Sequence, residues 1–272
     1  MNKHSMKRAA AVAGQFYHGS HSRLKEQVEE YMDPGARKKK AIGIVVPHAG
    51  FIYSGSVAGQ VFSSIHFPQT FLMLGPNHTG LGPGISIMAD GAWEVPNGSF
   101  EIDRRLASRI AQNVSIVEKD VQAHIFEHSL EVQLPFIAYF GEQIKIVPIA
   151  VLSASFDDCC SLAEGIAKAV KTIDYPITLL ASTDFSHYVP EKVARKNDKK
   201  AIDRIIDIDP RGLYETVLKD KISMCGYLPT TAMLYAARLL GADSGHLIRY
   251  MTSGDVSGDF DSVVGYAGII IA

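Results

Sequence analysis

The chain has little cysteine, almost no net charge and no long apolar run, and each shortage excludes a class of protein. Three of its 272 residues are cysteines, and Cys159 and Cys160 are adjacent, so no disulfide framework is indicated. With an N-terminus that lacks the apolar core of a signal peptide, this predicts a cytoplasmic protein. No apolar run approaches the ~20 residues of a membrane span, so no membrane association is expected.

Charge and motif content exclude further functions. Lys and Arg number 27 against 29 Asp and Glu, a net charge of −2, so no overall basic field is expected to attract nucleic acid. The sequence contains no G-x-S-x-G elbow, no P-loop and no H-E-x-x-H motif. No G-x-G-x-x-G follows a predicted strand, so a nucleotide cofactor is not supported.

The order of apolar segments predicts one α/β domain over residues 1–272. Segments of strand length alternate with segments of helical periodicity, which favours a mainly parallel or mixed central sheet covered by helices on both faces. The predicted strands are 41–46, 70–74, 145–152, 177–181 and 266–272. The predicted helices are 20–32, 54–65, 101–112, 129–140, 156–172, 191–206, 210–219 and 229–240. Pro148 places its strand at a sheet edge or a bulge.

Three of the predicted strands lead within a few residues to a histidine. These are His48 after 41–46, His78 after 70–74 and His187 after 177–181. Ligands of open α/β sheets bind beyond the carboxyl ends of the strands, so the three side chains are expected to converge on one cleft. Neutral imidazole is the commonest metal ligand. A single histidine of this kind could simply hydrogen-bond the backbone, but two at equivalent places favour a metal site at His48 and His78.

The segment Ser182-Thr183-Asp184-Phe185-Ser186-His187 offers a carboxylate and an imidazole three residues apart. Asp184 could bind a metal or orient a ligand, and His187 could act as a general base. The alternative is a helix N-cap, for which Ser, Thr and Asp are all suited. We assign Ser182 and Thr183 to capping, and Asp184 and His187 to the cleft.

Two further segments carry candidate residues. Cys225 precedes a predicted helix, whose N-terminus would lower the thiol pKa and favour a thiolate; a small buried apolar residue is an equal alternative. Glu127-His128-Ser129-Leu130-Glu131 opens another predicted helix with Ser129 as its N-cap, and His128 and Glu131 could also face the cleft. His124 lacks such a context and is expected at the surface or in a loop.

Six segments, in this order, resemble the Memo family, named for the mediator of cell motility and also called AmmeMemoRadiSam system protein B. They are Ala13-Gly-Gln-Phe-Tyr17, Pro47-His-Ala-Gly-Phe-Ile-Tyr-Ser-Gly55, Gly75-Pro-Asn-His78, residues 127–136, Ser182-Thr-Asp-Phe-Ser-His187 and Cys225-Gly226. The resemblance runs nearly end to end and implies a fold like that of the class III extradiol dioxygenases (LigB-like), which are non-haem iron enzymes.

The resemblance also implies the site residues. The ligand positions of the family fall on His48, His78 and Cys225, and its neighbouring cleft positions on Asp184 and His187. Other cleft residues are expected from the matched segments, namely Phe16, Tyr17, Tyr53, His128 and Glu131. Phe16 stands where some members have Trp. A thiolate in place of the carboxylate of the dioxygenases makes copper or zinc plausible beside Fe(II).

These observations predict a metal-binding protein with a dioxygenase-like oxidoreductase reaction on a small or peptide-borne aromatic group, in which His187 moves the proton. A second hypothesis is a non-catalytic module that binds a peptide or a partner in the same cleft. The name of the family implies radical-SAM and AMMECR1-type partners for such a role. A third is a metal-dependent hydrolase that prefers zinc.

Overall fold

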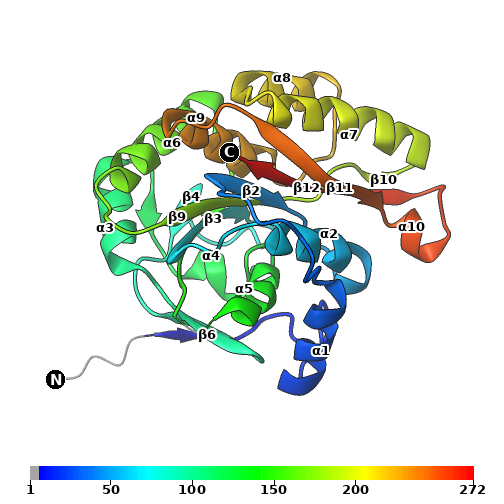
Figure 1. Cartoon of the computed structure of the whole chain (residues 1–272). Helices are drawn as coiled ribbons and strands as arrows, with labels where there is room; N and C mark the ends of the chain where they lie inside the picture. The colour runs from blue at the N-terminus through cyan, green and yellow to red at the C-terminus, as the bar shows by residue number, and fades with distance from the viewer. Residues whose placement is uncertain (1–5, 142) are drawn as a thin grey trace.

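A computed structural model describes residues 6–141 and 143–272 of the chain. Its centre is a nine-stranded mixed sheet with helices on both faces (Figure 1). Residues 1–5, on which part of the signal-peptide expectation rests, lie outside the described residues. Among the described residues, no helix has both the length and the apolar composition that crossing a membrane requires.

The strands form one large and one small sheet. The large sheet contains β2 (Gly43–Val46), β3 (Thr70–Pro76), β4 (Ile85–Ile87), β7 (Glu118–Lys119), β8 (Lys145–Val151), β9 (Ile177–Ser182), β10 (His187–Val189), β11 (Gly245–Thr252) and β12 (Val263–Ile271). Their order is β10-β12-β2-β9-β3-β8-β4-β7, with β11 also paired to β12. The small sheet contains β1 (Lys7–Arg8), β5 (Ala92–Val95) and β6 (Gly98–Glu101).

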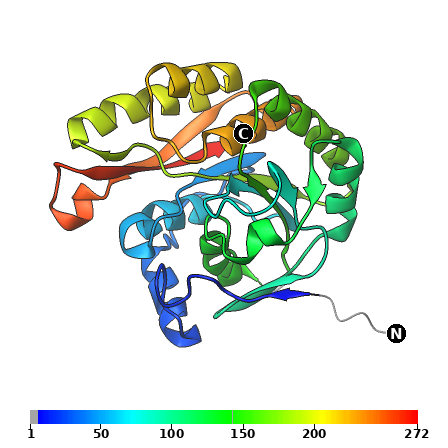
Figure 2. The ribbon, with the colours of Figure 1, turned by 180° about the vertical axis from the view of Figure 1, so that it is seen from behind.

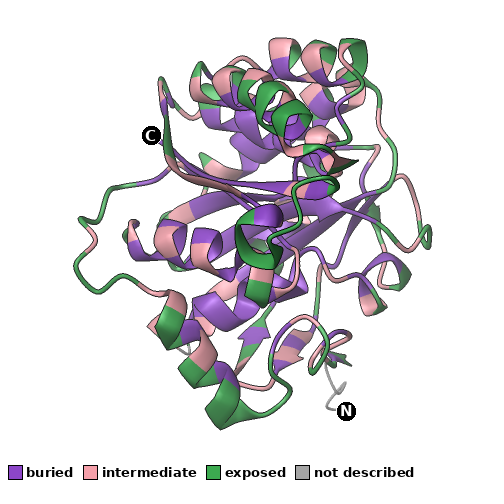
Figure 3. Cartoon of the chain, turned by 90° about the vertical axis from the view of Figure 1, so that its right-hand side faces the viewer, coloured by how far each residue is buried: buried purple, intermediate pink, exposed green. Residues whose placement is uncertain are grey.

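The four central strands run parallel, and this arrangement places the site. β2 pairs with β9, β9 with β3, and β3 with β8, all in parallel. Every residue of β2 and β3 is buried, as expected for strands that are covered on both faces. Figure 3 shows that the strands at the centre of the molecule are largely buried. The flanking strands β12 and β4 run antiparallel to β2 and β8, respectively. The predicted α/β fold with a mixed central sheet is therefore confirmed.

Helices cover the sheet on both sides (Figures 1 and 2). The first layer contains α1 (His21–Tyr31), α2 (Phe51–Ser63) and α5 (Leu134–Phe140). The second contains α3 (Arg104–Asn113), α6 (Phe156–Val170), α7 (Glu191–Ile206), α8 (Pro210–Lys219) and α9 (Tyr227–Leu239). The shorter helices are α4 (Gln122–Ile125), the 3-10 turn η1 (Glu131–Gln133) and α10 (Gly254–Ser257).

The strand that contains Pro148 is interior, so the expectation of an edge strand is wrong. β8 lies between β3 and β4, but β4 pairs only with residues 149–151. The amide of Met88 donates to the Pro148 carbonyl at 3.3 Å, so this carbonyl faces the β4 side. The nitrogen and carbonyl of one strand residue point to the same side. The missing N–H of Pro148 therefore lies beyond the β4 pairing and removes no hydrogen bond to β3.

His124 is fully buried, which corrects its expected place at the surface. Nε2 lies 3.1 Å from the Ser86 hydroxyl, and the ring packs edge-on against Trp93 with 5.8 Å between centroids. Burial, with the charge of Arg8 adding to it, lowers the pKa of His124 to about 4. The position was missed because one polar residue in a short helix gives no periodic signal.

We expect His124 to make the protein less stable as pH falls from about 6.5 to 4. In this range His124 binds a proton in the unfolded chain but stays neutral in the folded protein, so the free energy of unfolding decreases by roughly 3 kcal/mol. The difference is measured as the urea-unfolding free energy of wild type and His124→Gln across this range. The variant should show a shallower slope, whereas His246→Gln, at an exposed histidine of β11, should keep the wild-type slope. Equal slopes for wild type and His124→Gln would contradict the assignment.

Candidate functional site

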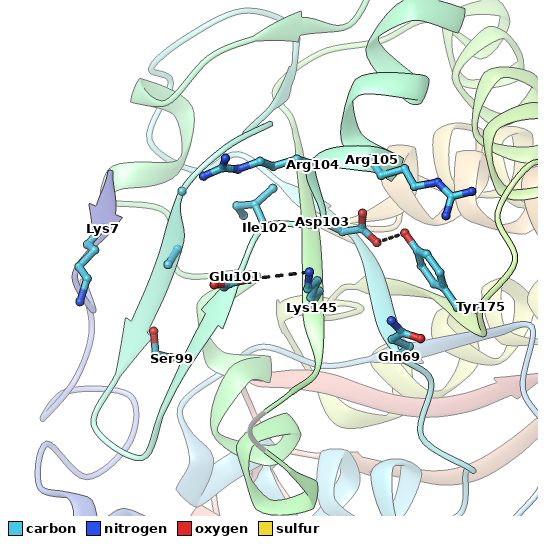
Figure 4. A pocket seen from close by; sticks show the side chains of 12 residues that line it. Lys7, Gln69, Ser99, Glu101, Ile102, Asp103, Arg104, Arg105, Lys145 and Tyr175 are labelled. Atoms are coloured by element: carbon cyan, nitrogen blue, oxygen red, sulfur yellow. Dashed lines mark hydrogen bonds and ion pairs between the residues drawn. The ribbon is translucent and has the colours of Figure 1, made fainter. Parts of the chain in front are cut away.

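Two cavities lie at opposite ends of the parallel strands. One, of about 640 Å³, lies beyond the carboxyl ends of β2, β3 and β9 and is lined by His48, His78, His128, Asp184 and His187 among others. We call it the histidine cavity. The other, of about 720 Å³, lies at the amino ends, beside Gln69, Lys145 and Tyr175 (Figure 4). Only the first is at the end where ligands bind in α/β sheets.

The amino-end cavity is polar, but its charges are already paired. Three of its basic side chains contact an acid: Lys7 with Glu94 at 2.6 Å, Arg105 with Asp174 at 2.7 Å and Lys145 with Glu101 at 3.8 Å. The buried carboxylate of Asp103 accepts from the hydroxyl of Tyr175 at 2.6 Å (Figure 4) and from that of Thr70 at 2.8 Å. These contacts hold β3, α3 and the segment before β9 together, and a structural role accounts for them.

Three imidazoles converge in the histidine cavity. One nitrogen from each of His48, His78 and His128 lies within 4.8 Å of the others, so the three can hold a metal ion. The ring centroids of His78 and His128 are 4.7 Å apart, and those of His48 and His78 are 5.3 Å apart. His48 and His78 follow parallel strands, as expected, whereas His128 enters from the segment between α4 and η1.

Glu127 orients His78. Its buried carboxylate lies 2.9 Å from Nδ1 of His78 and also accepts from the backbone N–H of His78. An ionised carboxylate can only accept, so Nδ1 carries the hydrogen and the lone pair of Nε2 is free for a ligand. Burial is the largest single influence and opposes ionisation, but the hydrogen bond and charge of His78, the Ser129 amide and the charge of His128 together outweigh it and lower the pKa of Glu127 to about 2.

His48 is the most buried of the three imidazoles. Its Nδ1 lies 3.0 Å from the Ser182 hydroxyl, and its backbone N–H donates to the Asp184 carboxylate at 2.8 Å. Burial and the neighbouring His128 and His78 hold the pKa of His48 well below its ordinary value. The ring is therefore neutral at physiological pH, which is the form that binds metals.

Cys225 contacts His48 but does not line the histidine cavity. Its Sγ lies 3.3 Å from Nε2 of His48 and accepts from the backbone N–H of Asp184 at 3.3 Å. Gly226 permits this approach, because a Cβ there would lie 2.5 Å from the Cβ of Thr183. Burial raises the pKa of the thiol to about 12, so it outweighs the lowering expected from the N-terminus of α9. Without a bound cation, Cys225 is a thiol.

The segment after β9 does not start a helix, so the N-cap assignment of Ser182 and Thr183 is wrong. Ser182 ends β9, and His187 begins the short strand β10. Asp184 and His187 both line the histidine cavity, as expected. Burial raises the pKa of Asp184 to about 6, against the hydrogen bonds that it accepts from the backbone. Nδ1 of His187 lies 2.7 Å from the carbonyls of Phe185 and Ser223, so it donates and leaves Nε2 free.

Aromatic side chains form the outer wall. Phe16 packs against His128 with ring centroids 4.7 Å apart, and Tyr53 also lines the cavity. Tyr266 and Tyr188 complete this wall, although neither was expected from the sequence. Tyr188 is 79% exposed and has a φ of 56°, a left-handed conformation that is unfavourable for a bulky residue. Strain of this kind is concentrated at functional sites.

Tyr17 and Glu131 lie behind the wall rather than at the cavity surface, which corrects their expected place in the cleft. The fully buried carboxylate of Glu131 accepts from the Tyr17 hydroxyl at 2.6 Å and from Arg8 at 2.7 Å. Arg8 also donates to the carbonyls of His124 and Glu127, each within 2.7 Å. The Arg8–Glu131 ion pair therefore fastens the N-terminal segment that carries Phe16 to the segment that carries His128.

Ser129 is not an N-cap either. Its hydroxyl donates to the Pro76 carbonyl at 2.8 Å, and the helical turn starts only at Glu131. The sequence also did not single out Glu127 and Gln133 as partners of the site. Both belong to the segment that resembles the Memo family, but the groups they contact, in Pro47, His78 and Ser182, lie at or just beyond the ends of distant strands. A local pattern cannot show such contacts.

Comparisons with known proteins find relatives of this chain over nearly its whole length. The family described as Memo-like protein matches residues 8–270. A MEMO1 family protein of Methanopyrus kandleri is 40% identical over 279 residues, which cover 97% of this chain and 99% of that protein. One of Methanothermobacter thermautotrophicus is 39% identical over 274 residues, with 96% and 99% covered. An uncharacterized protein from Escherichia coli K12 shares the fold, with a TM-score of 0.58 at 15% identity, over 85% of this chain and 100% of its own.

We expect Glu131→Gln to destabilise the protein by about 3–5 kcal/mol, because it leaves the buried guanidinium of Arg8 without a counter-charge. The matched control is Glu94→Gln, which breaks the exposed pair with Lys7 and should cost about 0–1 kcal/mol. Both values are measured as the free energy of unfolding in urea. Equal losses for the two variants would show that the buried pair does not fasten the N-terminal segment.

Proposed function

This chain belongs to the Memo family, and we propose that it is a metal-dependent oxidoreductase with its centre in the histidine cavity. The single observation that carries the proposal is the convergence of His48, His78 and His128, whose nitrogens lie within 4.8 Å of one another. Three separate segments deliver these side chains, and one carboxylate is committed to orienting His78. A packing role would not require that arrangement.

The donor set fits a transition metal. Imidazole nitrogens suit iron, copper and zinc, and the thiol of Cys225 is a softer donor beside Nε2 of His48. We propose that His48 and His78 are ligands in every case and that either His128 or Cys225 supplies the third position. Fe(II) is the first choice, because the family is related in fold to non-haem iron dioxygenases. A bound ion would supply a Lewis-acid or one-electron centre.

The residues around this centre would bind the substrate and move its proton. His187 presents Nε2 on a ring that lines the cavity, while its Nδ1–H is held by two carbonyls. This arrangement is suited to a general base. Phe16, Tyr53 and Tyr266 offer an aromatic wall, which favours a small or peptide-borne aromatic group as the ligand.

Metal content tests the proposal. We expect anaerobically purified wild type to hold close to one equivalent of iron, copper or zinc by elemental analysis. His48→Ala and His78→Ala should each lose the metal, because each removes a ligand. His246→Ala, at an exposed histidine, is the control and should keep it. The variants His128→Ala and Cys225→Ser identify the third ligand. Metal loss in His128→Ala but not in Cys225→Ser indicates a three-imidazole site, and the opposite result indicates the thiolate.

Two results would overturn the proposed metal centre. One is a wild-type protein that takes up no metal even after reconstitution with Fe(II), Cu(II) or Zn(II). The other is metal binding that survives in both His48→Ala and His78→Ala. If metal binds but no O₂ is consumed with catechols, the oxidoreductase assignment fails and the metal site remains.

A further inference from the structure

Ser182 is the point where three buried groups meet behind His48. Its Oγ lies 2.6 Å from the Ser129 carbonyl, 3.0 Å from Nε2 of Gln133 and 3.0 Å from Nδ1 of His48. Ser182, Ser129 and Gln133 are all fully buried. A hydroxyl has one hydrogen and can accept two hydrogen bonds, so three partners use its whole capacity.

The direction of each hydrogen bond follows from what the partners can do. The Ser129 carbonyl can only accept, so it takes the single hydrogen of Ser182. The Gln133 side-chain nitrogen also lies 2.9 Å from the Pro47 carbonyl, which again can only accept. This contact identifies the atom as the NH₂ group, so Gln133 donates to Ser182. The hydroxyl hydrogen of Ser182 therefore points at Ser129 and is not available to Nδ1 of His48.

We propose that Ser182 is a positioning residue that holds neutral His48 in its Nδ1–H tautomer. The hydroxyl of Ser182 donates its hydrogen to the Ser129 carbonyl. The lone pair that remains on Oγ of Ser182 therefore accepts from Nδ1–H of His48. Nε2 then carries a lone pair, and this is the nitrogen next to the sulfur of Cys225. Gln133 keeps the hydroxyl in this orientation, and its own Oε1 is left without a partner. That unpaired oxygen fits a side chain placed for its N–H groups.

Ser129 also helps to orient the second imidazole, that of His78. The backbone N–H of Ser129 donates to the Glu127 carboxylate at 2.9 Å, and Glu127 accepts from Nδ1 of His78. The carbonyl of Ser129 orients Ser182, which accepts from His48. One residue therefore organises the acceptors of both rings, so that both present Nε2. The inference deepens the proposed metal site and rests on it for its functional meaning, although the tautomer itself is a property of the metal-free protein.

The tautomer is measured in the metal-free protein by ¹⁵N chemical shifts of the histidine side chains at neutral pH. The signals of His48 are identified by their loss in His48→Gln. We expect a protonated Nδ1 and an unprotonated Nε2 in wild type. Ser182→Ala should remove the acceptor and shift the proton toward Nε2, where the sulfur of Cys225 can accept it. Ser182→Thr keeps the hydroxyl and should restore the wild-type pattern.

Two variants keep the test decisive. Ser54→Ala is the matched control, because Ser54 is also buried and donates to the carbonyl of Ala49, next to His48, without touching the ring. It should leave the tautomer unchanged. If Ser182→Ala does not fold, Ser182→Cys retains the size of the side chain with a weaker acceptor and should give the same shift. A wild-type Nε2–H tautomer, or an unchanged tautomer in folded Ser182→Ala and Ser182→Cys, overturns the proposal.

A zinc titration separates this inference from the proposed function. Loss of an outer partner of a metal-bound histidine weakens metal binding by about 10- to 100-fold, and we expect this for Ser182→Ala but not for Ser54→Ala. If wild type shows the Nδ1–H tautomer and Ser182→Ala shifts it, but wild type binds no metal, the positioning role holds and the metal proposal fails. If wild type binds metal and Ser182→Ala changes neither tautomer nor affinity, the positioning role fails and the metal site holds.

Discussion

The parallel pairing of β2, β9 and β3 is the constraint on which the rest of the site depends. The register places Val46 opposite Ser182 and Leu74 opposite Ala181, so the three strands end within about one residue of the same level. The chain beyond each end then enters the same space, with His48, His78 and Asp184 only a few residues from their strands. A shift in register would separate these side chains, because consecutive strand residues are about 3.3 Å apart.

Behind this edge lies a buried polar layer that organises the imidazoles. Ser129 stands at its centre: its amide, hydroxyl and carbonyl contact Glu127, Pro76 and Ser182 respectively. A second buried group, the Arg8–Glu131 pair, fastens the N-terminal segment to the same region. Such buried polar groups are costly unless they are satisfied, and here nearly every donor and acceptor has a named partner. The cavity wall is thereby set by hydrogen bonds as much as by apolar packing.

The sequence predicted the elements well where their apolar pattern was long or their ends were marked. Helices 191–206 and 210–219 have the predicted bounds. β8 and α6 begin at their predicted residues and end within one or two residues of the predicted ends. The predictions were wrong where a residue that is typical of a local motif instead bonds to a distant part of the chain. Ser129 and Ser182 look like helix caps, but their hydroxyls are used across the sheet edge. For Cys225 the sequence left a thiolate and a small buried apolar residue as equal alternatives, and burial, which raises the thiol pKa, favours the second.

The sequence by itself determined the fold class, the family and the cleft positions of His48, His78, Asp184 and His187, because each of these side chains follows closely on a strand and strand ends are readable from local patterns. Only the tertiary structure decided that His128 joins His48 and His78, that Glu131 serves as a buried counter-charge, and that Ser182 faces Nδ1 of His48. The reason is physical: these roles are contacts between segments more than 40 residues apart, and their geometry depends on strand register, which single-chain periodicity does not encode.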